Sequence, residues 1–327
     1  MLRRRPQTYS DERDIAAAAR TILAVEDGAL DHSRAKLALD ALVDPSLDAA
    51  ATTAALDRMA DEAWRLAGPG APEGARLGAV RRLLHDSGPW NGHRPFGYDH
   101  GDPLGTAIPG KLIANYLERR LGNCVSMPIL FLILAEKLGV ALRLASAPHH
   151  MFLRYLAPDG TTINIEATSG GHPARDIWYR RNFAMSDRAL ATGLYMRTLS
   201  RREGLALMAT TLLEHLLAGR RYEEAIAVAD VILEHNPRDG QVMVAQASAY
   251  GGLIRARFAD RYPMPILIPE PLRPLYWLFQ QRNDALFAAA EALGWEPDGE
   301  VEPPPPSPGF AKQAPRACNH PEESPCS

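Results

Sequence analysis

The sequence has few cysteines and no long apolar segment. Only three of its 327 residues are cysteine, and two of these fall in the last ten positions. So few thiols cannot build a disulfide framework, and this usage is typical of a reducing compartment. The longest apolar run, 129–135, is far shorter than the roughly 20 residues of a membrane-spanning helix. No apolar segment follows the basic start MLRRRP, as it would in a signal peptide. We therefore expect a cytoplasmic protein with no membrane partner.

An excess of positive charge is also absent. Lysine and arginine total 36 against 39 acidic residues, which gives a net charge of -3. Such a chain lacks the positive field that concentrates proteins on nucleic acid, so we expect no nucleic-acid partner. The glycine-rich stretch GPGAPEG is not followed by the Lys-Ser or Lys-Thr of a phosphate-binding loop. These observations predict neither a nucleotide site nor a cofactor.

Alanine and leucine, in contrast, are abundant and recur at helical spacing at both ends of the chain. Between them the period changes, because LRLASA, HMFLRYLA and GTTINIEATSGG alternate or are enriched in β-branched and aromatic residues. The pattern predicts an α+β protein with two or three antiparallel strands. The predicted parts are a domain over 10–200 (helices 10–85, an ordered loop 86–110, a core 111–200), a helical region over 201–295 and a disordered proline-rich tail over 296–327.

Cys124 is the only cysteine outside the tail, and it precedes an apolar helical pattern that ends before Gly139. Gly122 and Asn123 form a turn signal, so the thiol is expected at or within the first turn of that helix, where the helix dipole stabilises a thiolate. Pro128 is harmless only if it also lies in the first turn. Such a cysteine is more often a small buried hydrophobe than a nucleophile, and position alone does not decide between them.

A thiol nucleophile needs a base, normally histidine, which a third polar group orients. The segment APHHMFLRY supplies two histidines at the start of a strand, and alternation allows only one of them to face a given partner. In the next strand Asn164 and Glu166 share a face, so either could orient the imidazole. Glu166 could instead pair with Arg154 or face solvent.

At these residues the sequence resembles the SirB1 family, whose N-terminal region is transglutaminase-like. LGNCVSMPILFLILAEKLGV, APHHMFLRY and NIEATSGG carry the resemblance, which extends over about residues 10–255. It implies a helix packed on an antiparallel sheet, with Cys124 as nucleophile, His150 as base and Glu166 as acid. Glutamate replaces the family's usual aspartate, which leaves Asn164 as the alternative third member. Many SirB1-like sequences have proline where this chain has Cys124, so the fold also exists without the thiol.

Two functions follow from this interpretation. The first is a cysteine-dependent enzyme that hydrolyses or transfers an amide or related acyl group, with a protein or peptide as substrate. The second is a non-catalytic scaffold that holds a protein partner. Three aromatic residues of the 86–110 loop, Trp90, Phe96 and Tyr98, are candidates to line the cleft.

Two short segments contain several potential metal ligands. Asp99, His100 and Asp102 lie close together in the 86–110 loop, and CNHPEESPC lies in the tail. Neither has the regular spacing of a metal site, so we predict none.

The helical region after residue 200 contains a possible repeat. RRYEEAIAVADVILEHNPRD resembles the second half of a tetratricopeptide repeat, with Tyr222, Ala225 and Pro237 at the aromatic, small and terminal proline positions. An ordinary helical hairpin that caps the first domain explains the same pattern. SirB1-like proteins have such repeats at this end.

Overall fold

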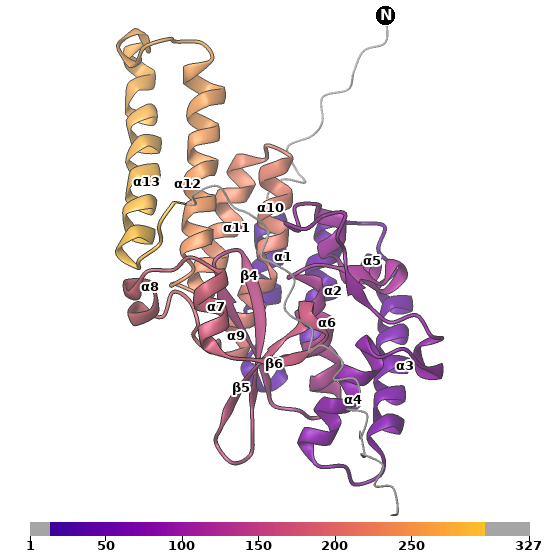
Figure 1. Cartoon of the computed structure of the whole chain (residues 1–327). Coiled ribbons are helices and arrows are strands. Elements are labelled where there is room, and N and C mark those ends of the chain that lie inside the picture. Colours follow the sequence, from indigo (N-terminus) through magenta and orange to yellow (C-terminus); the bar gives the residue numbers. More distant parts are fainter. Residues whose placement is uncertain (1–13, 298–327) are drawn as a thin grey trace, which may run out of the picture.

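A computed structural model describes residues 14–297 (Figure 1). The predicted tail over 296–327 therefore lies almost entirely outside the described residues, as do Cys318, Cys326 and residues 10–13. The described chain is an α+β structure, as predicted: a small antiparallel sheet lies among helices contributed by both ends of the chain. Within it, no helix is both long and apolar enough to cross a membrane.

The N-terminal segment consists of helices on one side of the molecule, drawn in indigo and purple in Figure 1. The stretch GPGAPEG separates the last two of them, as its glycines and prolines predict. These helices are α1 (Asp14–Leu23), α2 (His32–Val43), α3 (Ala49–Ala67) and α4 (Glu73–His85). Asp31 and Asp48 accept hydrogen bonds from first-turn amides of α2 and α3, so each helix begins at a capping residue.

The segment between α4 and the sheet is mostly irregular until the chain enters two helices. Its regular parts are short: 3₁₀ turns Pro89–Asn91 and Ile108–Lys111, and a parallel pair of two-residue strands, β1 (Gly97–Tyr98) and β2 (Leu121–Gly122). The two helices are α5 (Ile113–Arg119) and α6 (Ser126–Lys137). Gly139 has φ +66°, a left-handed conformation that suits the residue just after a helix, and α6 ends before it as predicted.

Helix α6 lies between the N-terminal helices and the sheet. It contacts α3 and α4 on one side and β3 and β4 on the other, and all residues from Ser126 to Ala135 are buried. A helix covered on every side is apolar on every side, which explains the uninterrupted run of large apolar residues in its sequence.

The main sheet has four antiparallel strands in sequence order, β3 (Leu142–Ala147), β4 (His150–Leu156), β5 (Thr162–Glu166) and β6 (His172–Ala174). Side chains alternate as predicted: Met151 and Leu153 join the core beneath α6, whereas Phe152 packs on Tyr179 across the other face. The fourth strand was not predicted, because three residues containing a proline carry no alternation to detect.

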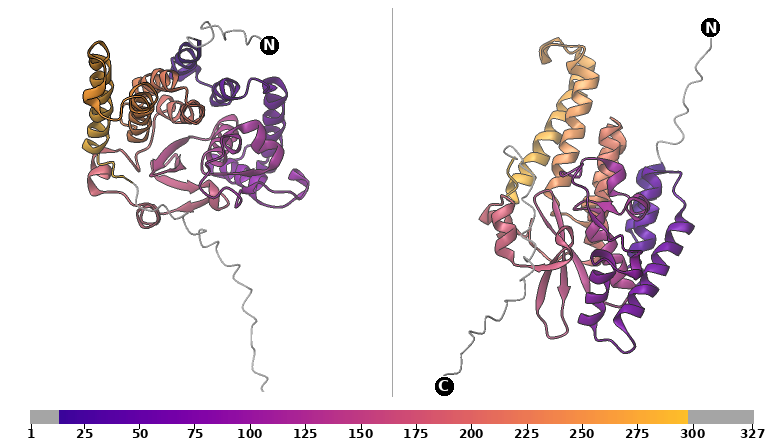
Figure 2. Two further views of the ribbon diagram at one scale, coloured as in Figure 1. Left: turned by 90° about the horizontal axis from the view of Figure 1, so that it is seen from above. Right: turned by 45° about the vertical axis from the view of Figure 1, so that its right-hand side comes forward.

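Helices of the C-terminal half follow the sheet in sequence, and those over 201–254 share the core that lies beneath α6. Two short helices not predicted from the sequence, α7 (Asp176–Asn182) and α8 (Asp187–Thr192), precede the longer ones. The remainder are α9 (Arg201–Met208), α10 (Thr210–Ala218), α11 (Tyr222–His235), α12 (Gly240–Ile254) and α13 (Arg273–Ala292). Helix α1 packs against α11, so the start of the described chain meets its C-terminal half. The α12–α13 hairpin projects beyond the rest of the molecule (Figure 2).

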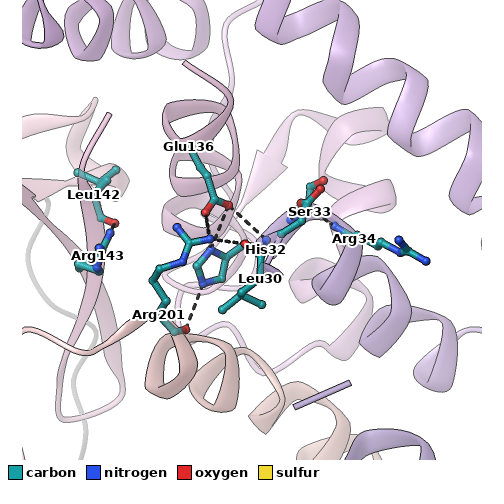
Figure 3. Close-up of polar contacts among 9 residues, drawn as sticks. Leu30, His32, Ser33, Arg34, Glu136, Leu142, Arg143 and Arg201 are labelled. Atoms are coloured by element: carbon teal, nitrogen blue, oxygen red, sulfur yellow. Dashed lines mark hydrogen bonds and ion pairs between the residues drawn. The ribbon is translucent and has the colours of Figure 1, made fainter. Parts of the chain in front are cut away.

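A polar cluster joins three helices that are distant in sequence (Figure 3). The carboxylate of Glu136, in the last turn of α6, lies 3.1 Å from Nδ1 of His32 on α2 and forms an ion pair with Arg201 on α9. The other ring nitrogen of His32 lies 3.1 Å from the Arg201 carbonyl oxygen. Although burial opposes ionisation, His32 and Arg201 hold the pKa of Glu136 below its usual value. The cluster ties the N-terminal helices, α6 and the C-terminal helices together.

Candidate functional site

Cys124 lies in the turn that leads into α6. The Asn123 side chain organises this turn, because its Oδ1 accepts hydrogen bonds from the amides of Val125 at 3.0 Å and Ser126 at 3.2 Å. The Met127 amide donates to the Asn123 carbonyl oxygen, so Asn123 acts as the cap and Cys124 occupies the first turn. Pro128 follows Met127 directly, so its missing N–H removes one helical hydrogen bond, the one that would otherwise reach the Cys124 carbonyl oxygen.

The Cys124 backbone N–H differs from its neighbours. Within residues 14–297 the Cys124 N–H donates no hydrogen bond, whereas the amides of Val125 and Ser126 both donate to Asn123 Oδ1. An unpaired amide at the start of a helix can donate to a negatively charged oxygen that forms beside the thiol.

The first strand residue after the β3–β4 turn is His150. The sequence placed both histidines on the strand, but His149 lies in the turn with φ +52°, and its carbonyl oxygen is 3.5 Å from Cys124 Sγ. The His150 side chain is buried and forms a hydrogen bond with Cys124. Because its Nε2 faces Glu166, Nδ1 is the ring nitrogen left for the sulfur.

Glu166, the last residue of β5, is 1 % exposed and orients the imidazole. Its Oε2 lies 2.8 Å from His150 Nε2 and accepts a hydrogen bond from the Tyr179 hydroxyl at 3.0 Å. Its Oε1 accepts from the amide of Thr168 at 2.9 Å and from the Thr168 hydroxyl at 2.5 Å. A buried carboxylate with this many donors is fixed in position, and the pairing with Arg154 considered from the sequence does not occur.

The electrostatics of the pair follow from its contacts. Burial alone would lower the pKa of His150, but the Glu166 carboxylate and the hydrogen bonds to Cys124 and Glu166 outweigh it and raise that pKa to about 10. Burial would raise the pKa of Glu166, and the charge of His150 together with the Thr168 hydrogen bonds lowers it instead. The two side chains therefore form an imidazolium–carboxylate pair at neutral pH.

Asn164, the alternative orienting residue, points elsewhere. Its Nδ2 donates to Asp176 Oδ1 at 2.6 Å and to the Ala174 carbonyl oxygen at 3.2 Å. The structure thus brings together Cys124, His150 and Glu166 but does not place the Asn164 amide on the imidazole. Tyr179 and Thr168 were not predicted as site residues; Thr168, two residues after the acid, is a local signal for such a hydrogen bond.

A cavity of about 140 Å³ adjoins the thiol and the imidazole. Its walls come from both halves of the chain: Lys111 and Met151 from the core, and residues of α10 and α12, including Glu214 and Ala245, from the C-terminal helices. Lys111 and Glu214 form an ion pair. Such a volume resembles the ~150 Å³ of an engineered cavity that binds benzene, so the space next to the sulfur admits a group the size of one side chain.

None of the three loop aromatics expected at the cleft is among the residues that line the cavity at Cys124. Trp90 and Phe96 line a separate cavity between α3, α4 and α5. Burial raises the pKa of Tyr98 to about 12, and its hydroxyl donates to the Pro103 carbonyl oxygen. The prediction failed because the direction of each of these side chains depends on tertiary contacts, which cannot be recognised in the sequence.

Two carboxylates of the 86–110 loop already have partners in the protein. Asp99 pairs with Arg119 at 2.7 Å, and Asp102 accepts hydrogen bonds from the amides of Thr106 and Ala107. Among residues 14–297, no group of three or more His, Cys, Asp or Glu side chains could hold a metal ion.

Comparison with protein families identifies the part of the chain that holds these residues. Residues 50–184 match the model of a family described as the transglutaminase-like superfamily. They form a transglutaminase-like core domain. No curated protein and no solved structure matched the chain. The transglutaminase-like match includes Cys124, His150 and Glu166 and ends before α8, so the C-terminal wall of the cavity lies outside it.

Proposed function

We propose that the chain is a cysteine-dependent enzyme that hydrolyses or transfers an amide or related acyl group. The contact chain from Cys124 through His150 to the buried Glu166 carries this proposal. A thiol, an imidazole and an orienting carboxylate in series are the parts that nucleophilic acyl transfer requires. The transglutaminase-like superfamily match is consistent with such chemistry.

The proposed reaction begins with attack of the Cys124 sulfur on a substrate carbonyl carbon. The oxygen gains negative charge and accepts a hydrogen bond from the Cys124 N–H. Imidazolium His150 donates a proton to the leaving amine as the carbon–nitrogen bond breaks, which leaves a thioester on Cys124. Neutral His150 then takes a proton from water or from a second amine, whose attack releases the acyl group and the thiolate.

We further propose that the chain is a SirB1-like protein whose C-terminal helices are related to tetratricopeptide repeats. Helix α11 begins at Tyr222 and ends at His235, just before Pro237, and Ala225 is fully buried. These positions agree with the repeat's aromatic, terminal proline and small-residue sites. A protein or peptide is the proposed partner, and its cysteine usage favours the cytoplasm.

The non-catalytic scaffold is the second candidate, favoured by the α12–α13 hairpin. Among the described residues, six of the eleven exposed large apolar side chains fall between positions 264 and 278, with Ile266 74 % exposed. Exposed apolar side chains that gather in one region often mark a protein-binding surface. In this case the thiol would have no catalytic task.

Alkylation of Cys124 distinguishes the two functions. In a background with both tail cysteines replaced by serine, the iodoacetamide rate at pH 7 should fall roughly tenfold or more in His150→Ala, because the imidazolium that favours thiolate is lost. His100→Ala, which removes an exposed histidine of the 86–110 loop, is the matched control and should react like the parent.

Incubation with p-nitrophenyl acetate supplies the second readout. The parent should accumulate an acetyl thioester on Cys124, detectable by mass spectrometry, and His150→Ala should accumulate less. Equal alkylation rates in the parent and His150→Ala, or a thiol that reacts only after denaturation, would contradict the enzymatic function and support the non-catalytic scaffold.

A further inference from the structure

A second cavity in the described part of the chain is separate from the thiol site. It measures about 400 Å³, within the roughly 300–1,000 Å³ typical of small-molecule sites, and shares no lining residue with the cavity at Cys124. Its walls come from α3, α4, the Pro89–Asn91 turn and the end of α5. The chemistry proposed for Cys124 leaves this cavity without a role.

One face of α3 forms a polar wall of the cavity. Ala55, Arg58, Met59, Glu62 and Arg65 recur at intervals of three and four residues, so they share that face. Glu62 is the one acid in the lining, and Arg65 pairs with it at 2.8 Å. Within residues 14–297, the Arg58 guanidinium has no hydrogen bond or ion pair, so its five donors face solvent.

A second arginine enters from the opposite wall. Arg120 ends α5 in a left-handed conformation with φ +58°, and its Nη1 donates to the Asn91 carbonyl oxygen at 2.6 Å and to that of Arg94. These hydrogen bonds fix the guanidinium of Arg120 and leave its other N–H groups available to a further acceptor. Burial and the charge of Arg94 lower the pKa of Arg120, which means that its positive charge lacks compensation. An anion would supply that compensation.

The remaining lining is apolar and aromatic. Leu83 and Phe96 are almost fully buried, Met59 and Trp90 are partly exposed, and the Arg120 guanidinium lies 5.1 Å from the centre of the Phe96 ring. Arg82 covers Trp90 at 4.2 Å, so that ring is held in place. Such surfaces accommodate the body of an organic molecule whose charged end reaches the arginines.

We propose that this cavity binds a small organic anion, with its carboxylate, sulfonate or phosphate between Arg58 and Arg120 and its apolar body against Met59, Trp90 and Phe96. Three arginines against one paired glutamate give the lining a net positive charge on a chain whose overall charge is -3. The site acts independently of Cys124.

Two fluorescent probes test charge and shape separately. 8-Anilinonaphthalene-1-sulfonate is an aromatic anion, and N-phenyl-1-naphthylamine has the same aromatic body without the sulfonate. The full chain should bind the anion at one site, with the neutral probe bound more weakly. Arg58→Glu should weaken binding of the anion roughly tenfold or more, as expected for a lost charged hydrogen bond, and should leave the neutral probe unchanged.

Matched variants locate the site. Ala55→Trp fills the cavity and should abolish binding of both probes, whereas Ala54→Trp, the exposed neighbour on α3, should not. Arg34→Glu reverses an exposed charge on α2 and controls for overall charge. Failure of the anionic probe to bind, binding that survives both Arg58→Glu and Ala55→Trp, or equal losses for the two probes in Arg58→Glu would overturn the proposal.

Discussion

At the scale of single residues, Glu166 illustrates how a buried charge is maintained. Its two oxygens contact His150, Tyr179 and Thr168, so both oxygens have hydrogen-bond partners. Removing one member of a buried pair would leave the other uncompensated, which is costly. The pair is therefore tested best by neutralising both members together.

The double variant His150→Gln/Glu166→Gln should reveal how much the pair contributes to stability at each pH. The pKa of His150 rises from 6.5 in the unfolded chain to about 10, so its contribution is complete below about pH 6.5 and is lost as the pH rises through 10. The lowered pKa of Glu166 makes its contribution complete above 4.5 and lost below it. Urea unfolding should thus show the largest excess stability of the parent between pH 5 and 6.5, with a decline toward pH 10. Parallel stability curves would contradict this assignment of charge.

At the scale of elements, α6 has a polar attachment at each end and an apolar body between them. Asn123 organises its start beside the thiol, and Glu136 near its end contacts α2 and α9. The direction of α6 is therefore set by contacts on two sides of the molecule. The cluster at Glu136 lies far along the helix from the sulfur, so its effect on folding can be measured without altering the site.

Replacing Glu136 by glutamine should lower the free energy of unfolding by about 1.5–3 kcal/mol at pH 7, the range for hydrogen bonds to charged groups. The lowered pKa of Glu136 means that the loss should shrink as the pH falls below 4.5, because protonation neutralises the parent as well. Denaturant unfolding at pH 7 and pH 3 measures both. Glu118→Gln, at an exposed position on α5, is the control and should change stability little. An equal loss at the two pH values would show that charge is not the cause.

At the scale of the whole molecule, the cavity at Cys124 depends on segments about a hundred residues apart. Helices α10 and α12 complete it, although the family match ends at residue 184. Ala245 of α12 lines the cavity and is partly exposed, so a larger side chain at this position can extend into the cavity without displacing the core.

Ala245→Trp should slow alkylation of Cys124 severalfold, and a bulky maleimide should be slowed more than iodoacetamide. The reason is steric, because an indole occupies much of a 140 Å³ cavity. Ala256→Trp, at an exposed position beyond α12, should react like the parent. Rates for the two reagents, with unfolding curves to confirm folding, provide the measurement. Unchanged rates in Ala245→Trp would show that reagents reach the sulfur by another route.

How much could be predicted from the sequence varied with the range of the interactions involved. Helical periodicity predicted the long helices, including those of the 201–295 region, the last of which is α13. Strand β6 and helices α7 and α8 escaped prediction because three to seven residues are too few to establish a period. The cavity walls could not be predicted, since no local pattern relates Met151 to Ala245. Gly171, expected only as half of a Gly-Gly pair, has φ +67° and no room for a side chain beside Phe131.

The residues proposed to react and some of the residues that line the cavity belong to different parts of the chain. The sulfur, the ring and the carboxylate belong to one contiguous stretch, whereas part of the boundary that a substrate would meet belongs to another. Substitutions along α10 and α12 can therefore change which molecules enter while every reacting atom stays in place. In a lineage of such chains, the range of molecules admitted to the cavity would diverge through substitutions in α10 and α12 alone.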